Sequence, residues 1–112
     1  MPVLSEKEAQ KTIVKPGVER YLIHGNGLMT VVIDFINGPW DKPDPMHNHV
    51  HEQTTYVAEG EILFMCEGEP EQRLKAGDIF YVPSGKNHTI QVLTQHVRLI
   101  DSFNPIREDF LK

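Results

Sequence analysis

Apolar and polar positions alternate along most of the chain, from Glu19 to the C-terminal segment. Short runs rich in Val, Ile, Leu and Phe are separated by Gly, Pro and Asn, which is the pattern of β-strands joined by tight turns. Many short strands at this spacing are typical of a sandwich or a small barrel. We therefore predict an all-β chain with strands over residues 21–24, 28–36, 54–59, 61–67, 79–82, 88–94 and 97–103.

The strand predicted over residues 61–67 is apolar on both faces, because Ile62 and Phe64 alternate with Leu63 and Met65. A strand that is buried on both sides needs a second layer to cover it. This strand therefore predicts either a second sheet or a partner subunit.

Turn and helix signals lie at three places outside the strands. Asn26-Gly27, between the first two strands, is a strong signal for a β-hairpin. The segment SEKE, residues 5–8, matches a capping box, and a short helical turn and an exposed arm both remain open there. Pro105 suits the first position of a helix, so one helical turn is predicted within residues 105–112.

Composition and charge narrow the possible partners. Apolar residues make up 39% of the 112 residues and charged residues 24%, which allows one packed domain over residues 1–112. A formal net charge of -5 without a basic cluster lacks the electrostatic footprint of a nucleic-acid-binding protein. No apolar run approaches the roughly 20 residues that cross a bilayer, and no secretory signal is visible. We therefore expect a cytoplasmic protein without nucleic-acid or membrane partners, and the single Cys66 excludes an intrachain disulfide.

Three histidines alternate in the segment PMHNHVHEQ, at positions 47, 49 and 51. Imidazole is the commonest metal ligand near neutral pH. On a strand, residues i and i+2 share a face and lie roughly 6.6 Å apart along the chain, whereas i and i+4 lie roughly 13 Å apart. His47 and His49 are therefore predicted to converge on one ion. His51 is predicted to lie in a turn that brings Gln53 back toward the same face.

Two linked motifs contain these residues, one over about residues 38–60 and one over about residues 77–92. They resemble the motifs of the cupin superfamily, G-x5-HxH-x3/4-E-x6-G and G-x5-P-x-G-x2-H-x3-N. The matching residues are His47, His49, Gln53 and Gly60, then Gly77, Pro83, Gly85 and His88. The departures from the pattern are a displaced Gly38, Gln53 in place of Glu, and Val92 in place of Asn.

The resemblance implies a cupin double-stranded β-helix, a small jelly-roll barrel with one divalent transition metal inside it. It also implies the ligand set His47, His49, Gln53 and His88. Because these four side chains are neutral, the ion keeps its full positive charge, which favours an anionic substrate and raises Lewis acidity. Imidazole-rich sites suit nickel, zinc, iron, copper and, less well, manganese, so the identity of the metal stays open.

The C-terminal segment VRLIDSFNPIREDFL holds a second candidate for chemistry. Alternation places Asp101 on the same strand face as Leu99 and Phe103. A carboxylate among apolar residues is costly to bury unless it has a partner or a task, and near a metal it can relay protons. Arg107 can bind a substrate carboxylate through its planar guanidinium. The alternative is a structural pair between Asp101 and Arg107 that closes the end of the barrel.

This segment also resembles one cupin subgroup, that of the pectin-degradation protein KdgF. Members combine HxHxHEQ with a terminal D-x-F-x-P-x-R-x-D-[FY]-L, matched here by His47 to Gln53 and by Asp101 to Leu111. The resemblance implies conversion of 4,5-unsaturated monouronates from pectin or alginate breakdown to linear 4-deoxy-5-keto uronates. By analogy, Asp101 is the acid/base, Arg107 orients the small sugar-acid substrate and Phe103 shapes the pocket.

Two other functions remain open beside this one. The same barrel supports other cupin metalloenzymes, such as an oxygenase or an isomerase, although neutral Gln53 argues against oxygenase chemistry. A noncatalytic module that binds a small ligand is the third possibility. In each case we expect a homodimer formed by sheet packing.

Several residues are given structural interpretations. His24 and His96 are expected in turns or at the surface, Cys66 in the core, and Glu52 in solvent. Tyr56 and Trp40 lie near the predicted site in sequence, but packing in the core or at the surface is the simpler interpretation of both.

Overall fold

The structure is a computed structural model that describes residues 3–111. Almost all regular structure in this range is β-strand, so the predicted all-β fold is confirmed. The elements, in chain order, are β1 (Thr12–Lys15), β2 (Val18–His24), β3 (Met29–Phe35), β4 (Glu52–Glu59), β5 (Glu61–Cys66), β6 (Gln72–Lys75), β7 (Ile79–Val82), β8 (His88–Val92), β9 (Val97–Asn104) and the 3₁₀ helix η1 (Glu108–Leu111). Residues 3–111 contain no helix of the length and apolarity that a membrane crossing requires.

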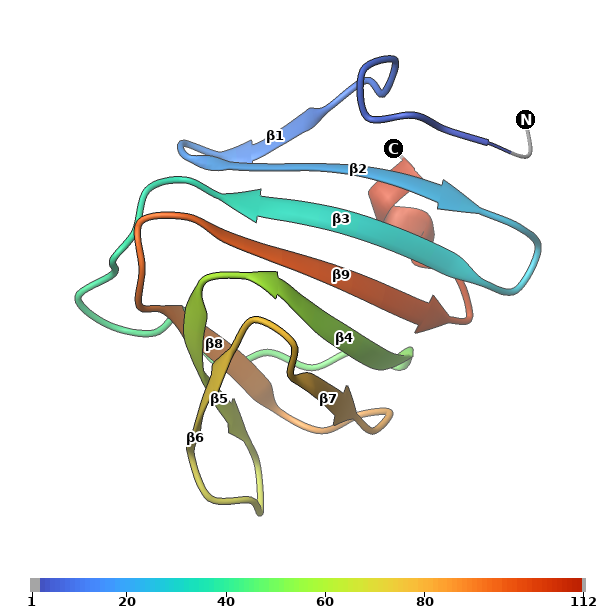
Figure 1. Cartoon of the computed structure of the whole chain (residues 1–112). Coiled ribbons are helices and arrows are strands. Elements are labelled where there is room, and N and C mark those ends of the chain that lie inside the picture. The colour runs from blue at the N-terminus through green and yellow to red at the C-terminus, as the bar shows by residue number, and fades with distance from the viewer. Residues whose placement is uncertain (1–2, 112) are drawn as a thin grey trace.

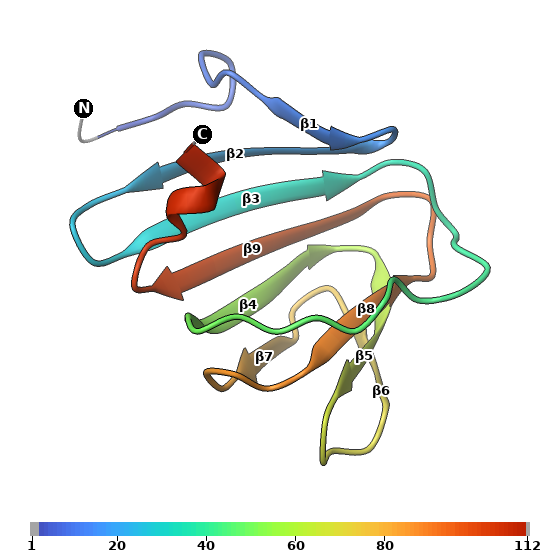
Figure 2. The ribbon, with the colours of Figure 1, turned by 180° about the vertical axis from the view of Figure 1, so that it is seen from behind.

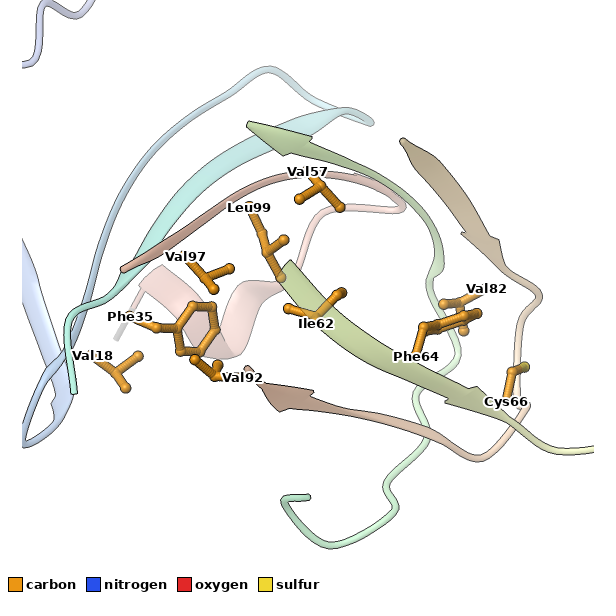
Figure 3. Packing of buried hydrophobic residues seen from close by; sticks show 10 residues of the cluster. All are labelled: Val18, Phe35, Val57, Ile62, Phe64, Cys66, Val82, Val92, Val97 and Leu99. Carbon is orange, nitrogen blue, oxygen red and sulfur yellow. The ribbon is translucent and has the colours of Figure 1, made fainter. Parts of the chain in front are cut away.

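The strands form two antiparallel sheets (Figure 1). The larger sheet has the order β1-β2-β3-β9-β4-β7, and the smaller one has the order β6-β5-β8. Of the second sheet and the partner subunit predicted from the two-sided apolar strand, the second sheet is present, with that strand, β5, at its centre. Leu63 and Met65 on its outer face are only partly buried. Side chains from both sheets pack between them as one apolar cluster (Figure 3), made of Val18, Phe35, Val57, Ile62, Phe64, Cys66, Val82, Val92, Val97 and Leu99.

Strand β9 lies in the middle of the larger sheet, paired with β3 on one side and β4 on the other. Val97, Leu99 and Phe103 are buried, as the alternation along this strand predicted. Asp101 shares their face and pairs in register with Val31 and Thr55. The register therefore places one carboxylate on the apolar inner surface of the barrel.

The loop between β3 and β4 follows the edge of β8 rather than leaving the body of the protein. Backbone hydrogen bonds join Trp40 N to Val92 O at 2.9 Å and His47 N to His88 O at 3.0 Å. A Cβ atom on Gly38 would collide with the backbone carbonyl of Thr94, so the start of this loop requires glycine. Figure 2 shows the loop on the same side of the large sheet as η1.

The sequence patterns did not fully predict the edge strands and the two terminal segments. Strands β1 and β6 were missed because both are short edge strands with mostly exposed residues and carry little apolar alternation. Pro105 does not begin a helix, because η1 starts at Glu108, and Lys112 lies outside the described residues. At the other end, the Ala9 amide donates to the Ser5 carbonyl at 3.0 Å, so the capping-box segment forms one exposed turn and no helix.

The sequence patterns also did not predict a network of charged residues at the start of β9. Asp34 is 5% exposed and accepts two hydrogen bonds of 2.9 Å from Arg98. His96, expected in a turn or at the surface, lies between Asp34 and Glu59, at 2.8 and 2.6 Å. The hydrogen bond with Asp34, reinforced by Glu59 and opposed by burial, raises the pKa of His96 above its ordinary value of 6.5.

We predict that His96 stabilises the fold in a pH-dependent way. Its folded-state pKa is raised, so its contribution is fully present below pH 6.5 and is lost as pH rises through the folded-state value. The difference in unfolding free energy between the wild type and His96→Gln should therefore shrink between about pH 6 and pH 9. Chemical denaturation across this range measures it, with His24→Gln on the exposed hairpin as the control. A difference that stays constant with pH would contradict the prediction.

Candidate metal centre

Three imidazoles converge at one point, where His88 is buried, His49 is half-buried and His47 is exposed. His47 and His49 come from the loop before β4, and His88 is the first residue of β8. One ring nitrogen of each lies within 4.8 Å of the others. The pairing of His47 and His49 was predicted from a regular strand, but this segment forms only an isolated bridge between His47 and His88. Backbone bonds to β8 therefore bring the rings together.

Backbone carbonyls fix the orientation of two of these rings. Nδ1 of His49 lies 2.7 Å from the carbonyl oxygen of His51, and Nδ1 of His88 lies 2.9 Å from that of Lys86. A carbonyl only accepts hydrogen bonds, so both Nδ1 atoms carry the proton when the rings are neutral. The Nε2 atoms then keep their lone pairs, which is the arrangement of metal-ligating histidines with outer-shell support.

The amide of Gln53 completes this donor set. Its Nε2 donates to Thr55 Oγ1 at 2.8 Å and to Asp101 Oδ1 at 3.4 Å, which fixes the orientation of the amide. Its Oε1 then faces His49 Nε2 at 3.1 Å. With the His49 proton on Nδ1, two lone pairs point at each other across this distance, an arrangement that a cation between them stabilises. The residues present therefore fit a divalent metal.

The ionisation of the histidines agrees with this role. Burial lowers the pKa of His88 to about 4, and burial followed by repulsion from His49 lowers the pKa of His47. Imidazoles must be neutral to bind a metal, so His88 needs no deprotonation step near pH 7. His51 lies in a bend before β4, as expected, and is not among the three clustered histidines.

Asp101 lies next to the Gln53 amide. Its Oδ1 accepts hydrogen bonds from Thr55 Oγ1 at 2.6 Å and from Gln53 Nε2 at 3.4 Å. Burial raises the pKa of Asp101 to about 6, against the opposing effect of the Thr55 hydrogen bond. The alternative of a structural Asp101–Arg107 pair is not what the structure shows, because Arg107 pairs with Asp109 at 2.9 Å.

A cavity of about 330 Å³ joins these groups. Its size falls within the range of small-molecule sites. The predicted site residues on its wall are His47, Gln53, His88, Asp101, Phe103 and Arg107. Phe103 stands edge-on to the His49 ring at 5.8 Å between centroids, and the Arg107 guanidinium lies over Phe103 at 5.3 Å. The structure thus places three of the four candidate metal ligands and the C-terminal candidates around one space, and His49 lies behind this wall against His88 and Phe103.

Arg20 and Phe110 also line the cavity, and sequence reasoning gave neither a role in the site, although Phe110 belongs to the C-terminal signature. Arg20 shares one face of β2 with Val18 and Leu22. A charged residue on an apolar strand face is the sequence signal that could have indicated its place in the cavity. Tyr56 is 45% exposed on the opposite face of the large sheet, and Trp40 packs edge-on against Phe35 at 5.7 Å. Neither lines the cavity around the histidines. Cys66 is buried in the core and Glu52 is exposed at the start of β4, as expected.

Comparison with known proteins agrees with this fold. The cupin domain family matches residues 39–103, and the chain belongs to this family. Within it, the chain is 36% identical over 97 residues to the pectin degradation protein KdgF of Dickeya dadantii (strain 3937), covering 85% of this chain and 84% of that protein.

Two solved structures are similar over almost the whole chain. The structure of KdgF from Halomonas sp. superposes with a TM-score of 0.84 at 32% identity and covers 95% of this chain and 96% of its own. An RmlC-like cupin from Shewanella frigidimarina NCIMB 400 gives a TM-score of 0.87 at 32% identity, with 98% and 96% covered.

We predict that metal binding depends on this donor set. His49→Ala should weaken binding of a divalent transition metal more than about tenfold, because it removes one ligand and the partner of Gln53. Elemental analysis after dialysis and calorimetric titration measure occupancy and affinity. The matched control is His24→Ala, which removes an exposed histidine at the end of β2. Equal metal content and affinity in His49→Ala and the wild type would exclude the site.

Proposed function

We propose that this protein is a metal-dependent enzyme that converts 4,5-unsaturated monouronates to linear 4-deoxy-5-keto uronates. The observation that carries the proposal is the position of Asp101, a carboxyl group hydrogen-bonded to the candidate metal ligand Gln53 in the cavity that also contains Arg107. The similarity to KdgF, a pectin degradation protein, supports the choice of a sugar acid as substrate.

The cavity provides groups suited to an anionic sugar. Arg107 has a planar guanidinium that can bind a carboxylate through two parallel hydrogen bonds. Phe103 offers an apolar ring next to it, which orients the face of a small ring-shaped substrate. The candidate ligands His47, His49, Gln53 and His88 are all neutral, so a bound divalent ion would add further positive charge. That ion would supply Lewis acidity that polarises an oxygen of the substrate.

Asp101 is proposed to move the proton in both halves of the reaction. Both of its hydrogen bonds fall on Oδ1, which leaves Oδ2 available to the substrate. In ring opening, the carboxylate takes the proton of the anomeric hydroxyl as the bond between C1 and the ring oxygen breaks. The products of this step are an aldehyde at C1 and an enolate at C5, and the proton stays on Asp101.

Ketonisation then completes the isomerisation. Asp101 returns this proton to C4 as the enolate becomes the carbonyl at C5, which regenerates the carboxylate. The reaction is therefore balanced without an oxidant or a second substrate. Thr55 and Gln53 hold the carboxyl group in place throughout, since both donate to the same oxygen.

We predict that Asp101→Asn lowers kcat by about 10²–10⁴-fold, the usual value of a general acid–base group. Asparagine keeps an oxygen that accepts from Thr55, so metal content should not change. The assay is the decay of ultraviolet absorbance of an unsaturated galacturonate, corrected for the spontaneous rate. Asp41→Asn, in the exposed part of the loop before the site, is the control. The proposal fails if metal-loaded wild type leaves the spontaneous rate unchanged.

We further propose that the protein is a homodimer formed through the outer face of the large sheet. The register aligns Tyr21, Val32, Ile100, Tyr56 and Ile79 in one row across five strands of this face. Ile79 is 73% exposed and Tyr56 45% exposed. The next row, Ile23, Thr30, Ser102, Thr54 and Tyr81, also carries no charge. A chain with net charge -5 can therefore associate with a second copy through this face without repulsion between like charges.

We predict that Ile79→Lys converts this dimer to a monomer, because it places a charge within the uncharged row of the proposed interface. Light scattering after size-exclusion chromatography measures the mass. Val3→Lys is the control, since Val3 is 67% exposed in the N-terminal arm, outside the proposed interface. A wild-type protein that is monomeric at high concentration would contradict the proposed dimer.

A further inference from the structure

Arg20 is a cation of the cavity without an acidic partner among residues 3–111. The other two cations on the cavity wall are paired: Lys15 with Asp44 at 3.1 Å and Arg107 with Asp109 at 2.9 Å. Within the described part of the chain, the buried Nε of Arg20 has no hydrogen-bond partner. A buried donor left without an acceptor costs free energy, and no described residue offsets this cost.

The position of Arg20 is fixed by an aromatic ring. Its guanidinium carbon lies 3.8 Å from the centre of the Phe110 ring, and that of Arg107 lies 4.2 Å from the same centre. The ring is thus in contact with both guanidinium groups. Burial, and then repulsion from Arg107, lower the pKa of Arg20. Two cations in contact with one ring and repelling each other are stabilised when an anion enters the space beside them.

We propose that Arg20 is a second substrate-binding residue, which together with Arg107 makes the cavity selective for a carboxylate-bearing sugar. This inference rests on the proposed function and deepens it by naming the residue that reads the charge of the substrate. Arg20 and Arg107 come from opposite ends of the chain, β2 and the segment before η1, and Phe110 holds them at the same wall of the cavity. A neutral sugar offers the Arg20 guanidinium only uncharged acceptors, whereas a uronate offers a charge-assisted hydrogen bond.

A purely structural role is the alternative, because Arg20 also packs against Phe110 and supports η1. The two roles differ in what a charge-removing substitution changes. If Arg20 only packs, Arg20→Met disturbs the cavity wall and weakens every ligand equally. If Arg20 binds the carboxylate, Arg20→Met weakens only the charged ligand, since methionine keeps an apolar stem against Phe110.

The test compares binding of D-galacturonate with binding of its neutral methyl ester to the metal-loaded protein, by isothermal titration. Arg20→Met should raise the dissociation constant for galacturonate about 10- to 100-fold and leave that for the ester within about twofold. Arg20→Lys should recover part of the loss, because it keeps the charge without the planar fork. Metal content and melting temperature should match the wild type. Arg73→Met is the matched control, since Arg73 is an exposed cation of β6 that pairs with Glu61 away from the cavity.

Three outcomes of the binding test would overturn the inference. These are unchanged galacturonate affinity in Arg20→Met, an equal loss of affinity for galacturonate and its ester, or a wild type that binds neither. The proposed reaction is tested separately by turnover of the unsaturated sugar. If galacturonate binding depends on Arg20 but the unsaturated sugar is not turned over, this inference is supported and the proposed reaction is contradicted. If Arg20→Met turns over the unsaturated sugar with an unchanged KM, this inference is contradicted and the proposed reaction is supported.

Discussion

The orientation of the Gln53 side chain is the constraint on which the rest of the site depends. Thr55 and Asp101 accept its amide hydrogens, so its oxygen must face His49, whose proton is held on the other ring nitrogen by the His51 carbonyl. Gln53 is thus hydrogen-bonded to the candidate acid/base Asp101, both directly and through Thr55, which connects the candidate metal centre to this carboxyl group. A glutamate at this position would place a second carboxyl against Asp101. The departure of Gln53 from the usual cupin pattern therefore matches the presence of Asp101 on the neighbouring strand.

The scaffold supports this arrangement through backbone pairing. Strand β4 carries Gln53 and Thr55 on one face, and its register with β9 sets Thr55 opposite Asp101. The loop before β4 is bonded to the edge of β8, which brings His47 and His88 together. A shift of one residue in either pairing would turn these side chains to the outer face. Strand register and one irregular loop thus position the candidate metal ligands and the candidate acid/base.

Alternation and motif spacing were sufficient to predict the all-β fold and most of its strands, because buried strands carry a clear apolar pattern. Strands β1 and β6 were missed because exposed edge strands do not carry it. The histidine cluster was found through spacing, although its convergence comes from a non-strand loop. The pairing of Arg107 with Asp109, the His96 network and the cavity position of Arg20 depend on contacts between distant segments, and no local pattern in one sequence reports such contacts.

The central claim is that a divalent ion is held by three imidazoles and the Gln53 amide. Anomalous diffraction from crystals soaked with a nickel or zinc salt tests it most directly. We predict one strong peak in contact with Nε2 of His49 and His88, a ring nitrogen of His47 and Oε1 of Gln53. No peak at this position, or a peak with the Gln53 oxygen turned toward Asp101, would contradict it.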